Sequence, residues 1–221
     1  MKRYIVIVAG GKGLRMGQDL PKQFIPLNGK PLLMHTLNVF HQWDSDAELL
    51  LVLPDSHQDY WGMLCRELNF SIPHKIVSGG ETRFYSVRNG LKEIREQGMV
   101  AVHDGVRPFV DPEVINACFT EAQTTGAAIP VVPIVDSVRR REGDKSYPVN
   151  RDELCAVQTP QVFVSDLLLS AYEQSYSDAF TDDASVVEAA GGRISLVAGN
   201  NENIKITTTA DLLYAKMLVE T

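Results

Sequence analysis

Glycines and positively charged side chains gather in one short stretch near the start of the chain. Gly10, Gly11 and Gly13 follow an apolar run, and Arg15 and Lys22 come soon after them. Glycine lets backbone N–H groups approach an anion closely, and a helix that begins there adds positive potential. Arginine and lysine neutralise the charge that grows on a phosphate during group transfer. The stretch therefore favours a loop that holds a nucleoside triphosphate.

Two other phosphate-binding patterns do not match this stretch. A dinucleotide fingerprint needs a third glycine, but counting from Gly11 and Gly13 that position is Met16, and Asp55 comes too late to bind a ribose. A Walker loop needs glycine, lysine and then serine or threonine, which no register of the stretch provides. A tight glycine turn with surface cations remains an alternative for the loop taken alone.

Short β-branched strands alternate with helical patterns along most of the chain. This alternation is typical of βαβ units and predicts one α/β domain over residues 1–221, Rossmann-like, with a mainly parallel sheet flanked by helices. The glycine-rich loop then follows the first strand, where open α/β sheets bind phosphates. The expected strands are 4–8, 48–53, 74–77, 99–103, 127–132 and 194–197.

Capping residues mark the ends of two helices. Asp111 is the expected N-cap of a helix that begins with a proline and ends at Gly126. Thr181 is the expected N-cap of another helix, which ends at Gly191.

The alternation of strands and helices stops between residues 133 and 163. A charged run from Arg139 to Lys145 lies there between short extended pieces. We interpret an insertion at about 134–158 as a projecting β-hairpin arm. A solvated surface loop fits the charge pattern equally well.

Charge and cysteine content narrow the class of protein. The formal net charge of −7 argues against a surface that coats nucleic acid, which needs a basic stripe. The first apolar run is too short for a signal peptide or a membrane span, so we expect no membrane partner. Cys65, Cys118 and Cys155 are widely spaced and show no zinc-ligand pattern. We expect buried thiols in a reducing, cytoplasmic compartment.

Asp104 is the carboxylate best placed to bind a metal. It ends an expected strand at the carboxyl edge of the sheet, where the ligands of open α/β folds collect. A lone carboxylate there suits Mg²⁺, whose shell is completed by phosphate oxygens and water. A turn or N-cap aspartate is the alternative for Asp104 in isolation. His103 beside it is expected to be a packed strand-end residue.

Six motifs follow one another along the chain. They are Gly-Gly-x-Gly-x-Arg-Met with Pro-Lys-Gln-Phe at 10–24, Gly-Gly-Glu-Thr-Arg-x-x-Ser-Val at 79–87, His-Asp-Gly-Val-Arg-Pro at 103–108, Thr-Pro-Gln-x-Phe at 159–163, Thr-Asp-Asp-Ala-Ser at 181–185 and Asn-Ile-Lys-Ile-Thr at 203–207. In this order they resemble the 2-C-methyl-D-erythritol 4-phosphate cytidylyltransferases over essentially the whole chain. The resemblance implies transfer of CMP from CTP to methylerythritol phosphate in the non-mevalonate isoprenoid pathway, with release of pyrophosphate.

The resemblance also implies roles for individual residues. The implied catalytic residues are Arg15, Lys22 and Lys205. The implied nucleotide-binding residues are Ala9, Gly10, Gly11, Gly13, Gly80, Glu81, Ser86 and Asp104. The implied polyol-binding residues are Asp104, Arg107, Ser137, Arg151, Thr159 and Thr181. Mg²⁺ on Asp104 is the implied cofactor. Taken alone, Lys205 could be an exposed strand lysine, and Glu81 and Ser86 could be ordinary first-turn helix residues.

The arm carries an implication for assembly. In the family that the chain resembles, the arm embraces a second subunit, so the resemblance implies a homodimer. Arg151, just after the arm, would then complete either its own site or that of its partner.

Three other functions compete with this interpretation. The ribitol 5-phosphate cytidylyltransferases share the first loop and the Val-Arg-Pro-Phe sequence at 106–109, whereas the sequences at 133–137 and 181–185 favour methylerythritol phosphate. A non-catalytic nucleotide-sensing domain could dispense with Lys22, Lys205 and Asp104, all of which are present. An NAD oxidoreductase is disfavoured by the mismatch to the dinucleotide fingerprint.

Overall fold

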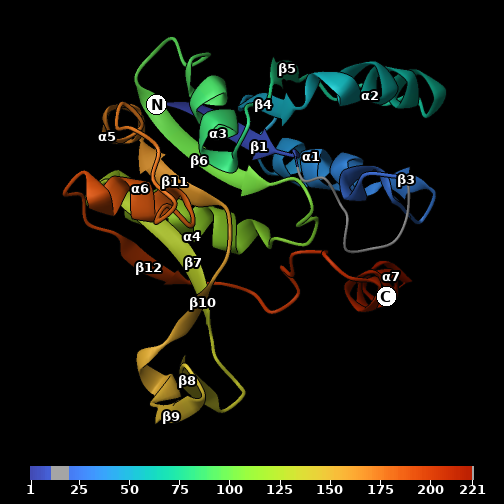
Figure 1. Ribbon diagram of the computed structural model, residues 1–221. Coiled ribbons are helices and arrows are strands. Elements are labelled where there is room, and N and C mark those ends of the chain that lie inside the picture. The colour runs from blue at the N-terminus through green and yellow to red at the C-terminus, as the bar shows by residue number, and fades with distance from the viewer. Residues whose placement is uncertain (11–19, 221) are drawn as a thin grey trace.

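The computed structural model describes residues 1–10 and 20–220 (Figure 1). The strands are β1 (Lys2–Val8), β2 (Pro26–Leu27), β3 (Lys30–Pro31), β4 (Glu48–Leu53), β5 (Lys75–Ser78), β6 (Gly98–Asp104), β7 (Ala127–Pro133), β8 (Val138–Glu142), β9 (Lys145–Val149), β10 (Cys155–Val157), β11 (Gln161–Val164) and β12 (Ser195–Ala198). The helices are η2 (Lys22–Phe24), α1 (Leu32–Trp43), α2 (Asp55–Glu67), α3 (Arg83–Leu91), α4 (Pro112–Thr125), η3 (Arg151–Glu153), α5 (Ser165–Ala171), α6 (Asp183–Ala189) and α7 (Thr209–Glu220).

One sheet organises the molecule. Its strands run in the order β10-β7-β11-β6-β1-β4-β5, and β12 also pairs with β7. The pairs β1–β4, β1–β6, β4–β5 and β7–β12 are parallel, whereas β11 and β10 pair antiparallel with their neighbours. The first strand, β1, lies in the parallel part of the sheet, as the sequence predicts.

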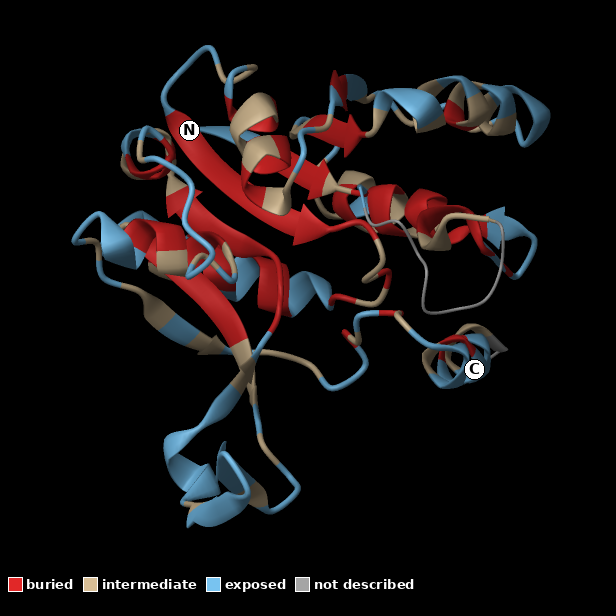
Figure 2. Ribbon diagram, in the orientation of Figure 1, coloured by how far each residue is buried: buried red, intermediate tan, exposed pale blue. Residues whose placement is uncertain are grey.

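Alternating side chains of the central strands serve two separate cores. On one face Ile5 and Ile7 of β1 pack with apolar residues of α1, α2 and α4. On the other face Tyr4 and Val6 pack with α3, α5 and α6. The period of two in a strand sends neighbouring side chains to opposite faces, so both faces are buried (Figure 2). The expected α/β domain with helices on both faces of its sheet is confirmed.

The helix ends follow the sequence signals with one correction. Asp111 caps α4 by accepting a hydrogen bond from the Glu113 N–H at 2.8 Å, and Gly126 ends the helix at φ +95°. The N-cap of α6 is Asp182, not Thr181, because Asp182 and Ser185 form a reciprocal capping box. The helix ends at Ala189, two residues before the end predicted at Gly191.

The charged stretch after β7 forms a hairpin that stands apart from the main sheet. β8 and β9 pair antiparallel, with Val138 opposite Val149, as a separate two-stranded sheet. Figure 1 shows this hairpin projecting below the sheet. β10 returns to the main sheet and pairs with β7, so the stretch expected as an insertion contains one strand of the core sheet.

The cysteines differ from expectation. Cys118 is buried, Cys65 is half-buried and Cys155 is exposed, and all three thiols are unpaired. The prediction of buried thiols is wrong for Cys155, which lies on β10 at the edge of the sheet. In the part of the chain that the structure describes, no helix is long and apolar enough to span a membrane.

Candidate active site

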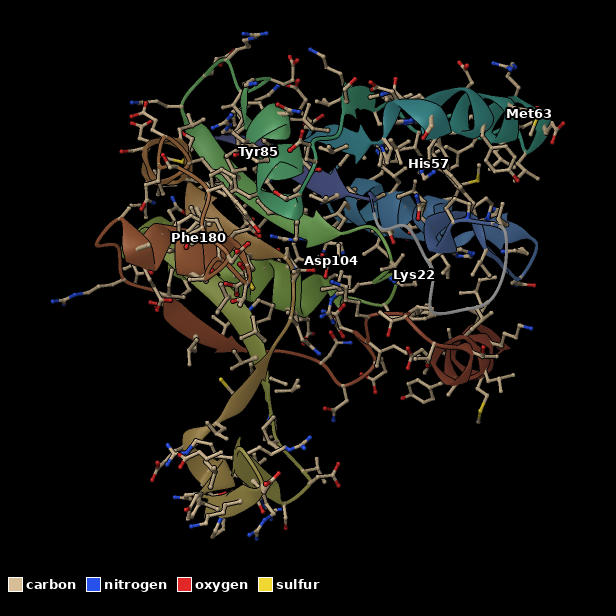
Figure 3. All side chains as sticks on the ribbon, viewed as in Figure 1. Lys22, His57, Met63, Tyr85, Asp104 and Phe180 are labelled. Atoms are coloured by element: carbon tan, nitrogen blue, oxygen red, sulfur yellow. The ribbon has the colours of Figure 1, made fainter. Side chains whose placement is uncertain are left out.

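The carboxyl ends of β1 and β6 meet at one edge of the sheet. Their parallel register places Val8 opposite Asp104. Figure 3 shows Asp104 at the end of β6. The Gly105 N–H continues this pairing by donating to the Val8 carbonyl at 2.9 Å. A β-carbon at Gly105 would lie 2.9 Å from that of Ala9, so only glycine allows the two loops to approach this closely. Ala9, directly after β1, and Gly105, directly after Asp104, are thereby brought side by side.

Two cavities of about 270 Å³ each open at this edge. The first is lined by residues 8–10, 22–23, 80–83 and 86. The second is lined by residues 157–159, 161 and 181–182, together with Arg107. Arg83, Asp104 and Lys205 line both cavities. These three side chains form the wall that the two cavities share.

Asp104 lies among three positively charged side chains. Its Oδ2 is 3.0 Å from Lys205 Nζ and 3.3 Å from Arg107 Nε, and its Oδ1 is 3.7 Å from Arg83 Nε. Burial alone would raise the pKa of Asp104, but the charges of Arg83, Lys205 and Arg107 hold that pKa well below its usual range. Asp104 is therefore an ionised carboxylate at neutral pH, in a surrounding that attracts anions.

Arg83 is the most firmly held of these cations. Its two terminal nitrogens donate to the Asp183 carboxylate at 3.0 and 2.7 Å, and the Tyr172 hydroxyl donates to the same carboxylate at 2.6 Å. Burial opposes the charged guanidinium, but Asp183 and Asp104 raise the pKa of Arg83 above its ordinary value. Arg83 is thus a fixed positive charge in the shared wall. Sequence reasoning gave it no role, although it lies inside the motif at 79–87.

Asn203 holds the segment that carries Lys205. The side-chain amide of Asn203 donates to the Thr159 backbone carbonyl at 2.8 Å. The backbone carbonyl of Asn203 accepts a hydrogen bond from Arg107 Nη1 at 2.7 Å. The motif at 203–207 forms no regular helix or strand. Directly after Lys205, the Ile206 N–H donates to the Val106 carbonyl at 3.0 Å. These bonds fix the backbone of the motif at 203–207 beside Asp104. The sequence analysis gave Asn203 no role either, although the residue lies within the motif at 203–207.

His103 is a packed strand-end residue, as expected. Its ring is fully buried and meets the Phe40 ring edge-on at 4.7 Å between centroids. Burial lowers the pKa of His103 to about 4, so the ring is neutral at neutral pH. Its Nε2 lies 3.0 Å from the Arg107 carbonyl, and its Nδ1 lies 3.0 Å from the Thr159 hydroxyl.

The loop after β5 closes the first cavity. The Gly80 N–H donates to Ser86 Oγ at 3.0 Å, and that hydroxyl is 2.9 Å from the Thr82 carbonyl. A β-carbon at Gly80 would collide with Tyr85, so the turn requires glycine there. On the opposite side of the cavity, the Gln23 amide donates to the Ala9 carbonyl at 2.8 Å and ties η2, which carries Lys22, to the end of β1.

Asp104 is the carboxylate in the wall shared by the two cavities that a metal ion could contact. Among the residues that the structure describes, no group of three or more histidine, cysteine or acidic side chains could hold a metal. Asp104 Oδ1 lies 3.7 Å from Arg83 Nε, beyond hydrogen-bond distance. The site can supply one oxygen to a metal whose other ligands come from a substrate.

Comparison with known proteins decides the family. The model of the family 2-C-methyl-D-erythritol 4-phosphate cytidylyltransferase matches residues 4–221. The chain belongs to this family. It is therefore a CTP-dependent nucleotidyltransferase. The ribitol phosphate enzymes, a sensing domain and an NAD oxidoreductase are not favoured by this match.

Relatives that carry the family name span the whole chain. The 2-C-methyl-D-erythritol 4-phosphate cytidylyltransferase of Phocaeicola vulgatus is 55% identical over 219 residues, which cover 99% of this chain and 100% of the relative. The enzyme of that name from Bacillus licheniformis is 38% identical over 223 residues, which cover 100% of this chain and 96% of the relative.

Solved structures of the family have the same fold. The crystal structure of the cytidylyltransferase from Thermus thermophilus matches with a TM-score of 0.82 and 31% identity, covering 100% of both chains. That of the 4-diphosphocytidyl-2C-methyl-D-erythritol synthase from Anaerococcus prevotii matches with a TM-score of 0.84 and 28% identity, covering 100% of this chain and 96% of that one.

The residues that the family resemblance singled out fall into four groups, and Asp104 and Lys205 belong to two of them. Those lining the first cavity are Ala9, Gly10, Lys22, Gly80, Glu81, Ser86, Asp104 and Lys205. Those lining the second are Asp104, Arg107, Thr159, Thr181 and Lys205. Ser137 and Arg151 are exposed near the arm, outside both cavities, and Arg151 Nη1 donates to the Val135 carbonyl. Gly11, Gly13 and Arg15 lie outside the described residues.

Proposed function

We propose that this family member joins CMP from CTP to 2-C-methyl-D-erythritol 4-phosphate at the wall between the two cavities. The observation that carries the proposal is that Arg83, Asp104 and Lys205 line both cavities. A phosphate oxygen of the polyol substrate attacks the α-phosphorus of CTP. The new bond joins that oxygen to the α-phosphorus, the bond to the bridging β-phosphate oxygen breaks, and pyrophosphate leaves.

The reaction needs no strong base from the protein. A phosphate monoester has a second pKa of about 6, so the attacking group is largely a dianion near neutral pH. The protein must instead bring two anions together and neutralise the charge that grows on the α-phosphate. We assign this neutralisation to Lys22 and Lys205, which line the first cavity, and to Arg15 in the glycine-rich loop.

We assign the nucleotide to the first cavity. Ala9, Gly10, Gly80, Glu81 and Ser86 line it, and the small side chains and backbone groups among them suit the edge of a pyrimidine. Gly11 and Gly13 would cradle the phosphates through backbone N–H groups.

We assign the polyol phosphate to the second cavity. Arg107, Thr159 and Thr181 line it and supply one positive charge and two hydroxyls, groups that can bind a phosphorylated polyol. Asp104, at the shared wall, faces the same substrate. Ser137 and Arg151 would reach a polyol site only through the arm of a second subunit.

Magnesium fits the site as an ion held mainly by the triphosphate. Asp104 would supply one protein oxygen, and phosphate oxygens and water would complete the shell. When bound, the ion neutralises and orients the phosphate oxygens of CTP. Removal of divalent ions with a chelator should abolish turnover, and added Mg²⁺ should restore it; full turnover in chelator would exclude this assignment.

We also propose a homodimer formed through the arm. An isolated two-stranded hairpin is marginal in water, and large apolar side chains are exposed along this region, with Val135 80% and Tyr147 43% exposed. Deletion of residues 138–149 should yield a monomer of low activity by light scattering and assay. A fully active dimer after this deletion would show that the arm does not form the dimer interface.

The protein is expected in the cytoplasm. Its three cysteines are unpaired in the structure, and Cys155 is exposed, which suits a reducing compartment. Immunodetection in the cytoplasmic fraction of the source cells would test this location, and recovery from an oxidising compartment would contradict it.

The direct test of the function is pyrophosphate release. Purified protein is incubated with CTP and Mg²⁺, and methylerythritol 4-phosphate or ribitol 5-phosphate is offered in parallel. We expect release with the first substrate, and a Lys22→Ala variant should lower it by about two orders of magnitude or more. Faster pyrophosphate release with ribitol 5-phosphate would make the protein a ribitol phosphate cytidylyltransferase. No release with either substrate would favour a nucleotide-sensing domain.

A further inference from the structure

The ring of His103 has a defined proton position. Its Nε2 lies 3.0 Å from the backbone carbonyl oxygen of Arg107, which can only accept a hydrogen bond. Nε2 therefore carries a proton. The ring is fully buried and packs edge-on against Phe40, an environment that favours the neutral form, so Nδ1 carries none.

This proton position determines how the Thr159 hydroxyl is oriented. His103 Nδ1 lies 3.0 Å from Thr159 Oγ1, and a bare ring nitrogen can only accept. The Thr159 hydroxyl must therefore donate its single proton to His103. The same oxygen accepts a hydrogen bond from the Asp104 N–H at 3.1 Å. Among the described residues no second hydrogen bond to this oxygen occurs, so one of its two lone pairs is left for a ligand.

We propose that Thr159 acts only as a hydrogen-bond acceptor towards the substrate, with His103 as the residue that positions its proton away from the second cavity. A substrate group at Thr159 must then donate a hydrogen bond. A hydroxyl of the polyol can donate, whereas a dianionic phosphate can only accept. The inference rests on the proposed function, because it places the polyol phosphate in the second cavity.

The consequence is a fixed direction for the substrate. A phosphate placed at Thr159 would meet a lone pair and be repelled. It is directed instead towards the cations around Asp104, where Lys205 and Arg83 line the cavity that we assign to CTP. His103 and Thr159 thus select the orientation in which the nucleophilic oxygen faces the nucleotide.

The first test measures the tautomer of His103 in the free protein. Nitrogen-15 chemical shifts of the ring are recorded at neutral pH with labelled histidine. The His103 signals are assigned by their loss in His103→Gln, or by elimination among the five histidines if that variant does not fold. We expect a protonated Nε2 and a bare Nδ1. A protonated Nδ1, in either the other tautomer or the charged ring, would overturn the proposal.

This measurement separates the inference from the function. It uses no substrate, so its outcome does not depend on whether the protein turns over methylerythritol phosphate. Failure of the proposed function would appear instead as no pyrophosphate release with either polyol phosphate.

The second test asks whether the substrate donates at Thr159. Each hydroxyl of the polyol phosphate is replaced in turn by hydrogen or by fluorine, which can accept weakly but cannot donate. At one position both replacements should raise KM for the polyol phosphate at least about tenfold, the effect of one lost hydrogen bond to a polar site, while KM for CTP changes less than about twofold. A fluorine analogue that restores normal KM at that position would show that Thr159 donates and would overturn the proposal.

Variants of Thr159 identify the partner of that hydroxyl. Thr159→Ser keeps the hydroxyl, so its KM should still rise when the same substrate hydroxyl is removed. Thr159→Val should raise KM for the full substrate and make it insensitive to removal of the same hydroxyl. If Thr159→Val stays as sensitive as the parent protein, another residue binds the hydroxyl, and the proposal fails.

Discussion

Lys205 Nζ lies 3.0 Å from Asp104 Oδ2 at the wall that the two cavities share. The two side chains differ in exposure: that of Lys205 is 44% exposed, whereas that of Asp104 is 9% exposed. The carboxylate is therefore a fixed point, and the ammonium group above it is accessible to an incoming phosphate. Asp104 holds the charge of Lys205 at the place where we expect the new bond to form.

Removal of the Lys205 charge should affect turnover and leave folding intact. Lys205→Ala is expected to lower kcat by about two orders of magnitude or more, because it removes a charge that acts on the transition state. Asp104 would lose its contact with Lys205 but would keep Arg83 and Arg107 beside it, so the unfolding free energy should fall by no more than about 1 kcal/mol. Lys216→Ala, an exposed lysine on α7 outside both cavities, is the matched control. Near-normal turnover of Lys205→Ala would show that Lys205 is not a catalytic residue.

The bidentate contact between Arg83 and Asp183 should be visible in stability. A lysine at position 83 cannot make both hydrogen bonds, so the fully buried Asp183 carboxylate would lose at least one hydrogen-bond donor. Arg83→Lys is expected to lower the unfolding free energy by about 1 to 3 kcal/mol in urea titration. Arg95→Lys changes an exposed arginine and should have almost no effect. Equal effects of the two substitutions would mean that the contact adds nothing beyond a surface pair.

His74 should make stability depend on pH. Its Nε2 accepts from Trp61 Nε1 at 2.9 Å, and its Nδ1 lies 2.8 Å from the Ile72 carbonyl, so the folded state holds the neutral ring. Burial lowers the pKa of His74. The unfolded chain then binds a proton below about pH 6.5 where the folded state does not, so stability falls as pH falls through that value.

The pH dependence can be measured through Trp61, which is fully buried beside His74. Urea unfolding followed by tryptophan fluorescence between about pH 7.5 and about pH 5.5 should give a falling free energy. His74→Gln should flatten this slope. An equal slope in the variant would assign the pH dependence to other groups.

The sequence predicts those parts of the site that local pattern encodes. Glycines after the first strand and Asp104 at the end of another each have a local signal, and parallel strands bring their carboxyl ends to one edge. The N-cap of α6 was predicted one residue too early, because Thr181 and Asp182 are both good capping residues. Only the capping box with Ser185 distinguishes them.

The rest of the site depends on contacts between distant residues. Arg83 and Asp183 are 100 residues apart, and Asn203 and Thr159 are 44 apart, so no local period relates them. The exposure of Cys155 likewise depends on the position of β10 at the edge of the sheet. Such properties follow from the order of the strands, which local hydrophobic patterns do not specify.

The two Michaelis constants of Glu81→Ala and Thr181→Val test most directly whether the nucleotide and the polyol phosphate occupy separate cavities. Each residue lines only one cavity. We predict that Glu81→Ala raises KM for CTP and leaves KM for methylerythritol phosphate within about twofold, and that Thr181→Val does the reverse; a lost contact of about 1 kcal/mol corresponds to roughly fivefold in KM. If either substitution raises both constants equally, or raises the other one, the two substrates do not meet across the wall formed by Arg83, Asp104 and Lys205.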